Sequence, residues 1–353
     1  MNTVRDRITG LDVYRITAVF FVFLFHSNMN FNCNYGRGTK YISMGAIYMT
    51  AFFLLSGFAL FHTWHKKNLT IISIIKQFYI KRLIGIMPLY YAVAIIHTLF
   101  IDKEALIQKV IIAPIEILGL QTVFTSLFGV AHNGGTWFVS CILLCYLAYP
   151  FIQEIAKQAS IKSRMTMIAL AFFVLLYSPI VVRVFNTSGI YSNPFFRILE
   201  FSIGVFLCSL MPAIKNNSFY NNLFTWKAVI IESVILFAGV TLAVMLNIAV
   251  GDYMLYSWVA LPMFMLQLIS MAGLTFPERL NGSKVLSYFS EISYAFFFAQ
   301  LFCWGAAGKI IEMIGYDNNT IRITVSLFIC FAYAIVLHEV IEKPIKSEII
   351  KHL

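Results

Sequence analysis

Long apolar segments are the feature of this sequence that most restricts its fold. A helix needs about 20 mostly apolar residues to cross a hydrocarbon core about 30 Å thick. Ten segments meet this requirement, at approximately residues 11–30, 44–64, 83–101, 137–155, 165–185, 195–212, 228–247, 254–275, 291–313 and 322–341. We expect the apolar stretch 105–124 to be an interfacial or re-entrant helix, with a full span as the alternative, because it contains Lys109, Pro114 and Glu116. The pattern predicts an all-α polytopic membrane protein with about ten transmembrane helices, forming one integral membrane domain over residues 1–353.

The composition supports this fold class and excludes a soluble one. Only 12% of the residues are charged and 60% are hydrophobic, whereas a soluble protein has about 25% charged residues. The net charge of +10 would suggest a nucleic-acid partner in a soluble protein, but here it reports orientation. If the N-terminus is cytoplasmic, 17 of the 26 basic residues fall in inside segments and four in outside loops. The positive-inside rule therefore predicts that both termini are cytoplasmic, and no nucleic-acid partner is expected.

Two polar residues of the first span, Arg15 and His26, are the strongest functional candidates. Charged and titratable groups inside a membrane are costly, and they commonly mark functional sites. The eleven-residue spacing places the two side chains within about 20° in azimuth and about 16 Å apart along a helix. Arginine matches phosphate geometry, and a neutral histidine can take a proton from a hydroxyl. The structural alternative is that Arg15 reaches the interface and His26 makes an interhelical hydrogen bond.

Four further residues are candidates for support or substrate binding. Asp12 has the spacing to pair with Arg15, and a catalytic role is the alternative. Arg197 and Glu200 have the same three-residue spacing and are expected to form an ion pair within the bundle. Trp137 fits an interfacial anchor or, alternatively, a surface for stacking a sugar. The six cysteines show neither metal-site spacing nor a disulfide pattern, so no metal is expected.

The same residues belong to a series of short motifs in a fixed order. Gly10-Leu11-Asp12-Val13-Tyr14-Arg15, followed by ten residues and His26, resembles the first-helix signature of the acyltransferase 3 family of membrane acyltransferases. Six later blocks are similar to other motifs of that family: Phe52–Phe58, Lys81-Arg82-Leu83 with Pro88-Leu89-Tyr90, Trp137–Ser140 with Tyr146-Leu147 and Pro150, Arg197 with Glu200-Phe201 and Gly204, Ile292-Ser293-Tyr294, and Ile341-Glu342-Lys343-Pro344. The resemblance extends over nearly the whole chain.

The resemblance implies an enzyme that transfers an acyl group, usually acetyl, from cytoplasmic acyl-CoA to a sugar hydroxyl. It implies that acyl-CoA is a donor substrate rather than a permanently bound cofactor. The acceptor would be a cell-surface or lipid-linked glycan, and the enzyme would be a multi-pass protein of the bacterial inner (plasma) membrane, in contact with its lipids. His26 would act as general base, with Arg15 and Arg82 binding the donor.

Three positions depart from the family pattern. Gly85 stands where a second arginine usually follows Arg82, Ile142 where the family often has a glutamate, and Gln300 where a histidine is common. These departures leave the details of donor binding open and argue against a mechanism with two histidines.

Two other classes of function compete with an enzyme. A polysaccharide exporter or flippase would also need many spans with interior polar groups, but it would favour inverted repeats and broken helices at the midplane, and the sequence shows neither pattern. A membrane sensor would carry a soluble output domain, and no such segment is evident. The pairing of Arg15 with His26 favours acyl transfer.

Overall fold

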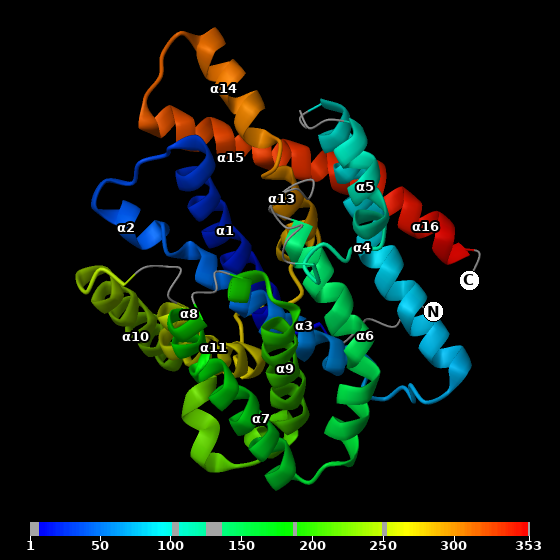
Figure 1. Ribbon diagram of the computed structural model, residues 1–353. Helices are drawn as coiled ribbons and strands as arrows, with labels where there is room; N and C mark the ends of the chain where they lie inside the picture. The colour runs from blue at the N-terminus through cyan, green and yellow to red at the C-terminus, as the bar shows by residue number, and fades with distance from the viewer. Residues whose placement is uncertain (1–6, 101–105, 125–135, 186–188, 249–252, 352–353) are drawn as a thin grey trace. The chain divides into compact units, whose positions relative to one another are not determined.

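The protein is helical throughout the part that the structure describes. The computed structural model describes residues 7–100, 106–124, 136–185, 189–248 and 253–351 (Figure 1). It is 84% helical, and no strand occurs in those residues. The α-helices are α1 (Thr9–Phe31), α2 (Thr39–Ile42), α3 (Tyr48–Trp64), α4 (Ile72–Phe100), α5 (Leu106–Ile117), α6 (Trp137–Gln158), α7 (Ile161–Leu176), α8 (Ser178–Phe185), α9 (Pro194–Lys215), α10 (Trp226–Met245), α11 (Leu261–Gly273), α12 (Lys284–Glu291), α13 (Ser293–Ala299), α14 (Cys303–Ile314), α15 (Asn319–Val336) and α16 (Lys343–Lys351). The predicted all-α class is confirmed.

The number of spans also agrees with the hydropathy pattern. Within the described residues, nine helical segments are long and apolar enough to cross a membrane. A tenth forms if α13 and α14, which are bent by 63° at their break, make one broken span. The sequence predicts one uninterrupted segment at 291–313, so the bend is a difference from the expectation. Only the count of ten would put the two ends of the chain on one side of the membrane, and the position of the termini stays a prediction.

Helix α5 is too short for a full span. Its 12 residues extend about 18 Å at 1.5 Å per residue, against a hydrocarbon thickness of about 30 Å. Pro114 lies inside it, and Glu116 is buried. The helix has the length expected of an interfacial or re-entrant element, and that placement stays a prediction.

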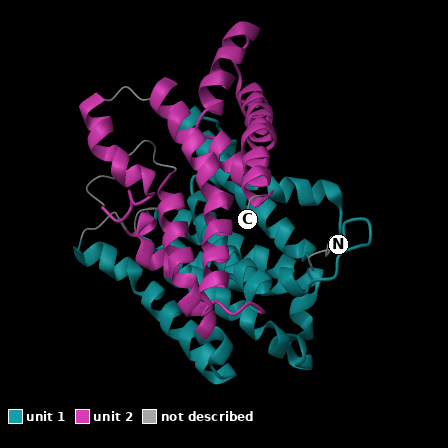
Figure 2. Cartoon of the chain, turned by 90° about the vertical axis from the view of Figure 1, so that its right-hand side faces the viewer, with its two compact units in different colours: residues 1–65, 155–188, 199–293 teal, residues 66–154, 189–198, 294–353 magenta. Residues whose placement is uncertain are grey.

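The chain divides into two compact units (Figure 2). The first unit comprises residues 1–65, 155–188 and 199–293, and the second comprises 66–154, 189–198 and 294–353. In the first unit, α1 packs against α3, α11 and α12, and α10 packs against α11. In the second, α14 packs along α15, and α4 contacts α16. Helices α6 and α9 contribute residues to both units.

Backbone-to-backbone contacts hold the helices of the first unit close together. A Cβ atom added at Gly57 of α3 would overlap the carbonyl oxygen of Phe201 in α9, and one added at Gly204 would overlap that of Leu54. Gly10 of α1 meets the carbonyl of Met271 in α11 in the same way. Small residues let membrane helices approach closely. Gly57, which lies within the motif Phe52–Phe58, therefore has a packing role.

The last span contains a local change of helical pitch. A π-helical turn, η9 (Leu337–Glu342), joins α15 to α16, and a second one, η8 (Leu255–Ala260), precedes α11. Turns of this kind are frequent at functional sites. η9 buries Leu337 and Glu342, and Glu342 belongs to the last motif of the sequence.

Candidate functional site

Helix α1 carries both of the principal candidates. It runs without a break from Thr9 to Phe31, so the side chains of Arg15 and His26 lie near one side of it, about 16 Å apart along the axis. Both are half-buried. Nη1 of Arg15 donates a hydrogen bond to Oγ of Ser290, 3.3 Å away. The imidazole of His26 lies beside the ring of Phe25, with 5.3 Å between the ring centroids.

Arg7, which precedes α1, joins the N-terminal end of this helix to α12. Nε and Nη2 of Arg7 donate to the two carboxylate oxygens of Asp12 at 2.6 and 3.1 Å. Nη1 of the same guanidinium reaches Oε1 of Glu291 at 2.7 Å, and Nη2 donates to the carbonyl of Ser287. The carboxylate of Asp12 thus pairs with Arg7, a partner that the three-residue spacing did not indicate, and its pairing with Arg15 stays a prediction. Asp12 supports the docking of α1 on α12, because a guanidinium can bind one carboxylate at two points and still reach a second.

In the second unit, Arg197 and Trp137 come together in a buried aromatic cluster. Arg197 is 0% exposed, and its guanidinium carbon lies 5.2 Å from the centroid of the Trp137 ring and 5.0 Å from that of Tyr191. Its Nε also donates to the carbonyl of Tyr191 at 2.8 Å. Desolvated cation–π contacts of this kind are worth about 2 kcal/mol or more. Because Trp137 is itself 5% exposed, its contacts fit support of Arg197 better than an interfacial anchor.

Glu200 lies in the interior of the first unit. It is 2% exposed, and Oγ1 of Thr50 in α3 donates to its Oε1 at 2.9 Å. A buried carboxylate requires such donors, since its desolvation is otherwise costly. The expected ion pair between Glu200 and Arg197 stays a prediction.

Arg82 lies on α4 in the second unit. Its guanidinium carbon is 5.9 Å from the ring centroid of Tyr146 in α6, and the residue is half-buried. At Gly85, one turn further along α4, no heavy atom of the described residues lies within 4 Å of an added Cβ, apart from the adjoining backbone of the helix itself. The site of the missing family arginine is thus open. Gln300, at the place of the usual histidine, is buried and donates to the carbonyl of Phe296 at 3.3 Å.

Two buried carboxylates were not among the site residues predicted from the sequence. Glu232 in α10 is 5% exposed and accepts a hydrogen bond from Oγ of Ser270 in α11 at 2.7 Å. Glu232 could have been recognised from the sequence, because it is a carboxylate within a predicted span. Glu342 in η9 binds Nδ1 of His338 at 2.8 Å and also Nζ of Lys346. The four-residue spacings were visible, but the burial of Glu342 was not.

These features define a class of protein. The chain is an all-α, multi-pass membrane protein with charged and titratable side chains held inside its helical units. It belongs to the acyltransferase 3 family, whose model, described as an acyltransferase domain, matches residues 8–339. The protein is accordingly a membrane acyltransferase. Neither the curated proteins nor the solved structures gave a significant match.

Proposed function

We propose that this enzyme transfers an acyl group, acetyl in the simplest case, from cytoplasmic acyl-CoA to a hydroxyl of a cell-surface or lipid-linked glycan. His26 is the general base, and Arg15 and Arg82 bind the phosphates of the donor. The site is in the bacterial inner (plasma) membrane. The observation that carries the proposal is the placement of Arg15 and His26 along one side of the unbroken helix α1, inside the segment that the family model matches.

The separation of these two residues suits a long donor. Acyl-CoA has phosphates at one end and a thioester at the other. Arg15 lies near the end of α1 that the basic residues predict to be cytoplasmic, and His26 lies about 16 Å deeper. Ser290 positions the Arg15 guanidinium at 3.3 Å, and the planar group has five N–H donors in a fork that matches phosphate.

The proposed chemistry uses His26 to move one proton. Neutral imidazole accepts the proton of the acceptor hydroxyl while the hydroxyl oxygen attacks the thioester carbonyl. The new ester C–O bond forms as the C–S bond breaks, and the proton passes to the departing CoA thiolate. The half-buried position of His26 gives the imidazole access to substrate while limiting its exposure to water.

Removal of the base tests the assignment. We expect His26→Ala to lower the rate of acyl transfer by about 10²–10⁴-fold, the usual contribution of a general base, at unchanged abundance in the membrane. The measurement is incorporation of label from acetyl-CoA into glycan by membranes. His97→Ala, which changes a half-buried histidine of α4, is the matched control and should keep activity. Undiminished transfer by His26→Ala would refute the role of His26.

The acceptor class has its own test. A strain that lacks the gene should retain its surface polymer and lose the ester signals from the proton NMR spectrum of that polymer. Loss of the polymer itself would contradict glycan acylation and favour export. Treatment of the polymer with base hydrolyses its esters, and detection of acetate or of succinate among the released acids identifies the acyl group.

A further inference from the structure

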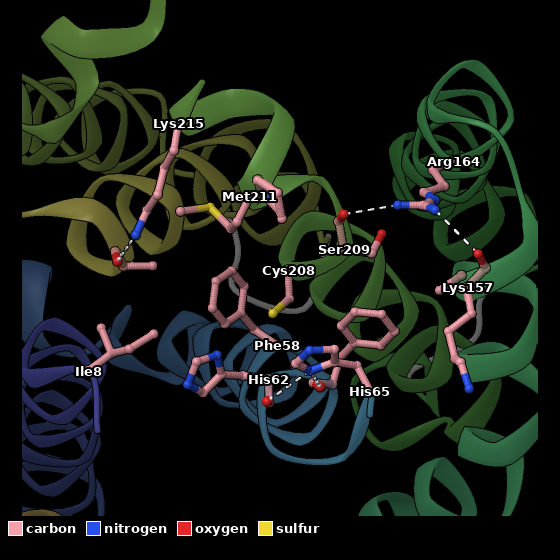
Figure 3. A pocket seen from close by; sticks show the side chains of 14 residues that line it. Ile8, Phe58, His62, His65, Lys157, Arg164, Cys208, Ser209, Met211 and Lys215 are labelled. Atoms are coloured by element: carbon pink, nitrogen blue, oxygen red, sulfur yellow. Dashed lines mark hydrogen bonds between the residues drawn. The ribbon is translucent and has the colours of Figure 1, made fainter. Parts of the chain in front are cut away.

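The first unit contains a cavity that the residues discussed above do not use. Its volume is about 530 Å³, within the range of about 300–1,000 Å³ that is common for small-molecule sites. The described residues that line it include no carboxylate and five side chains with basic or titratable nitrogens: His62, His65, Lys157, Arg164 and Lys215 (Figure 3). All of its lining residues belong to the first unit.

Six helix ends meet around this cavity. Its lining residues include Ile8 at the start of α1, Ala272 at the end of α11, and residues at the ends of α3, α6 and α9 and near the start of α7. In a chain whose spans alternate in direction, these six ends all lie on the side of the N-terminus. The positive-inside distribution predicts that this side is cytoplasmic. The cavity therefore faces the compartment that contains soluble phosphate esters and the anionic inner leaflet.

The arginine of the cavity is occupied by the protein. Nε of Arg164 donates to the carbonyl of Ala159 at 2.9 Å, and its two terminal nitrogens donate to the carbonyls of Ser209 and Lys157 at 3.0 and 3.4 Å. Cations complement the negative ends of helix dipoles, so this side chain braces the ends of α6 and α9. No ligand is needed to hold the Arg164 side chain in this position.

Two lysines also line the cavity. Lys157 and Lys215 are exposed, and Nζ of Lys215 contacts the carbonyl of Ala272 at 3.5 Å, the long limit of a hydrogen bond. An ammonium group has three donors, so a ligand can be bound in addition. In Figure 3 the two lysines lie toward opposite sides of the view, and the rings of His62 and His65 lie between them. Phe58, Phe61 and Met211 complete an apolar wall.

We propose that this cavity binds a small phosphate-bearing molecule with an apolar portion. A lysine ammonium group at either side of the cavity binds phosphate, and the aromatic and imidazole rings pack against the organic part. Two sources supply this chemistry on the cytoplasmic side: the nucleotide end of CoA and the headgroup of an anionic phospholipid. The nucleotide source rests on the proposed function, whereas the lipid source does not.

Binding measurements on the full-length protein test the proposal. In the first experiment, the protein is placed in nanodiscs of neutral phosphatidylcholine and titrated with adenosine 3′,5′-bisphosphate. In the second, phosphatidylglycerol is mixed into the nanodiscs, and the lipid molecules that the protein retains are counted by native mass spectrometry. One of the two probes should bind saturably and more weakly at high salt. In the variant Lys157→Gln/Lys215→Gln its affinity should fall about tenfold or more, because each charge-assisted hydrogen bond to phosphate is strong.

Lys227→Gln is the matched control, since Lys227 is an exposed lysine near the start of α10 and is outside the cavity lining. It should bind as the unaltered protein does. Because both cavity lysines are exposed, their replacement is expected to leave the fold intact, and single Lys215→Gln gives a second reading if the double variant is not recovered. Absence of binding by both probes, or equal binding by the cavity variant and Lys227→Gln, overturns the proposal. Nucleotide binding that is kept in Arg15→Gln and lost in the cavity variant separates this site from the donor-binding residues of the proposed function.

Discussion

The guanidinium of Arg7 joins α1 to α12 through two carboxylates. Asp12 is the more buried of these, with a side chain 11% exposed against 55% for Glu291. Hydrogen bonds to charged groups contribute about 1.5–3 kcal/mol each, and partial exposure of Arg7 reduces this. We expect Arg7→Gln to lower the free energy of unfolding by about 1–2 kcal/mol, measured as a shift of the thermal midpoint in detergent.

The control for this change is Arg322→Gln, which breaks the exposed pair with Asp317. Exposed pairs contribute little, so its midpoint should match that of the unaltered protein. Equal shifts for the two variants would show that the Arg7 network does not hold α1 in place.

For single residues, the sequence predicted which side chains are important better than it predicted which residues they contact. Asp12 was found because a carboxylate near the start of an apolar helix is conspicuous. Its partner was not, because Arg7 lies in the preceding turn and the second carboxylate, Glu291, is 284 residues away in the chain. Likewise, the burial of Arg197 against Trp137 and Tyr191 depends on how separate segments pack. Helical spacing describes neighbours on one helix only.

At the scale of helices, the crossing of α3 and α9 depends on Gly57 and Gly204. We expect Gly57→Ala to lower the free energy of unfolding by about 1–3 kcal/mol, because the added methyl group must displace the backbone of α9. The measurement is resistance to unfolding together with abundance in the membrane. Gly85→Ala in α4, where an added Cβ meets no atom within 4 Å, should be neutral or slightly stabilising.

A Gly57→Ala protein as stable as Gly85→Ala would contradict the close crossing. The contact also limits compensation: since the overlapping atoms are backbone carbonyls of Phe201 and Leu54, a smaller side chain at either position does not make room.

Helical elements could be predicted from the sequence with good agreement, because the lipid sets the length of a span and apolar runs report it directly. The break between Ala299 and Cys303 was not predictable in this way. The intervening Gln300, Leu301 and Phe302 include neither proline nor glycine, the usual local causes of a sharp bend. The sequence therefore gives no local signal for the bend.

For the whole molecule, the arrangement in the membrane is the main prediction still to be tested. Alkaline phosphatase, which is active only outside the cytoplasm, can be fused after chosen residues. Fusions after Lys40 and Asp317 should be active, and those after Lys67 and Asn216 inactive, if ten spans have both ends cytoplasmic. Activity after Asn216 would reverse the orientation and place the basic cavity on the outer side.

The cavity in the first unit has a consequence for assembly. Its walls come from segments between Ile8 and Ala272, so it exists only when helices from the beginning and the later part of the chain have come together. A molecule that binds there has no site on the unfolded chain, and at 100 times its dissociation constant it would add about 2.7 kcal/mol to stability by mass action. The local supply of that molecule would then set how much of the newly inserted protein survives quality control.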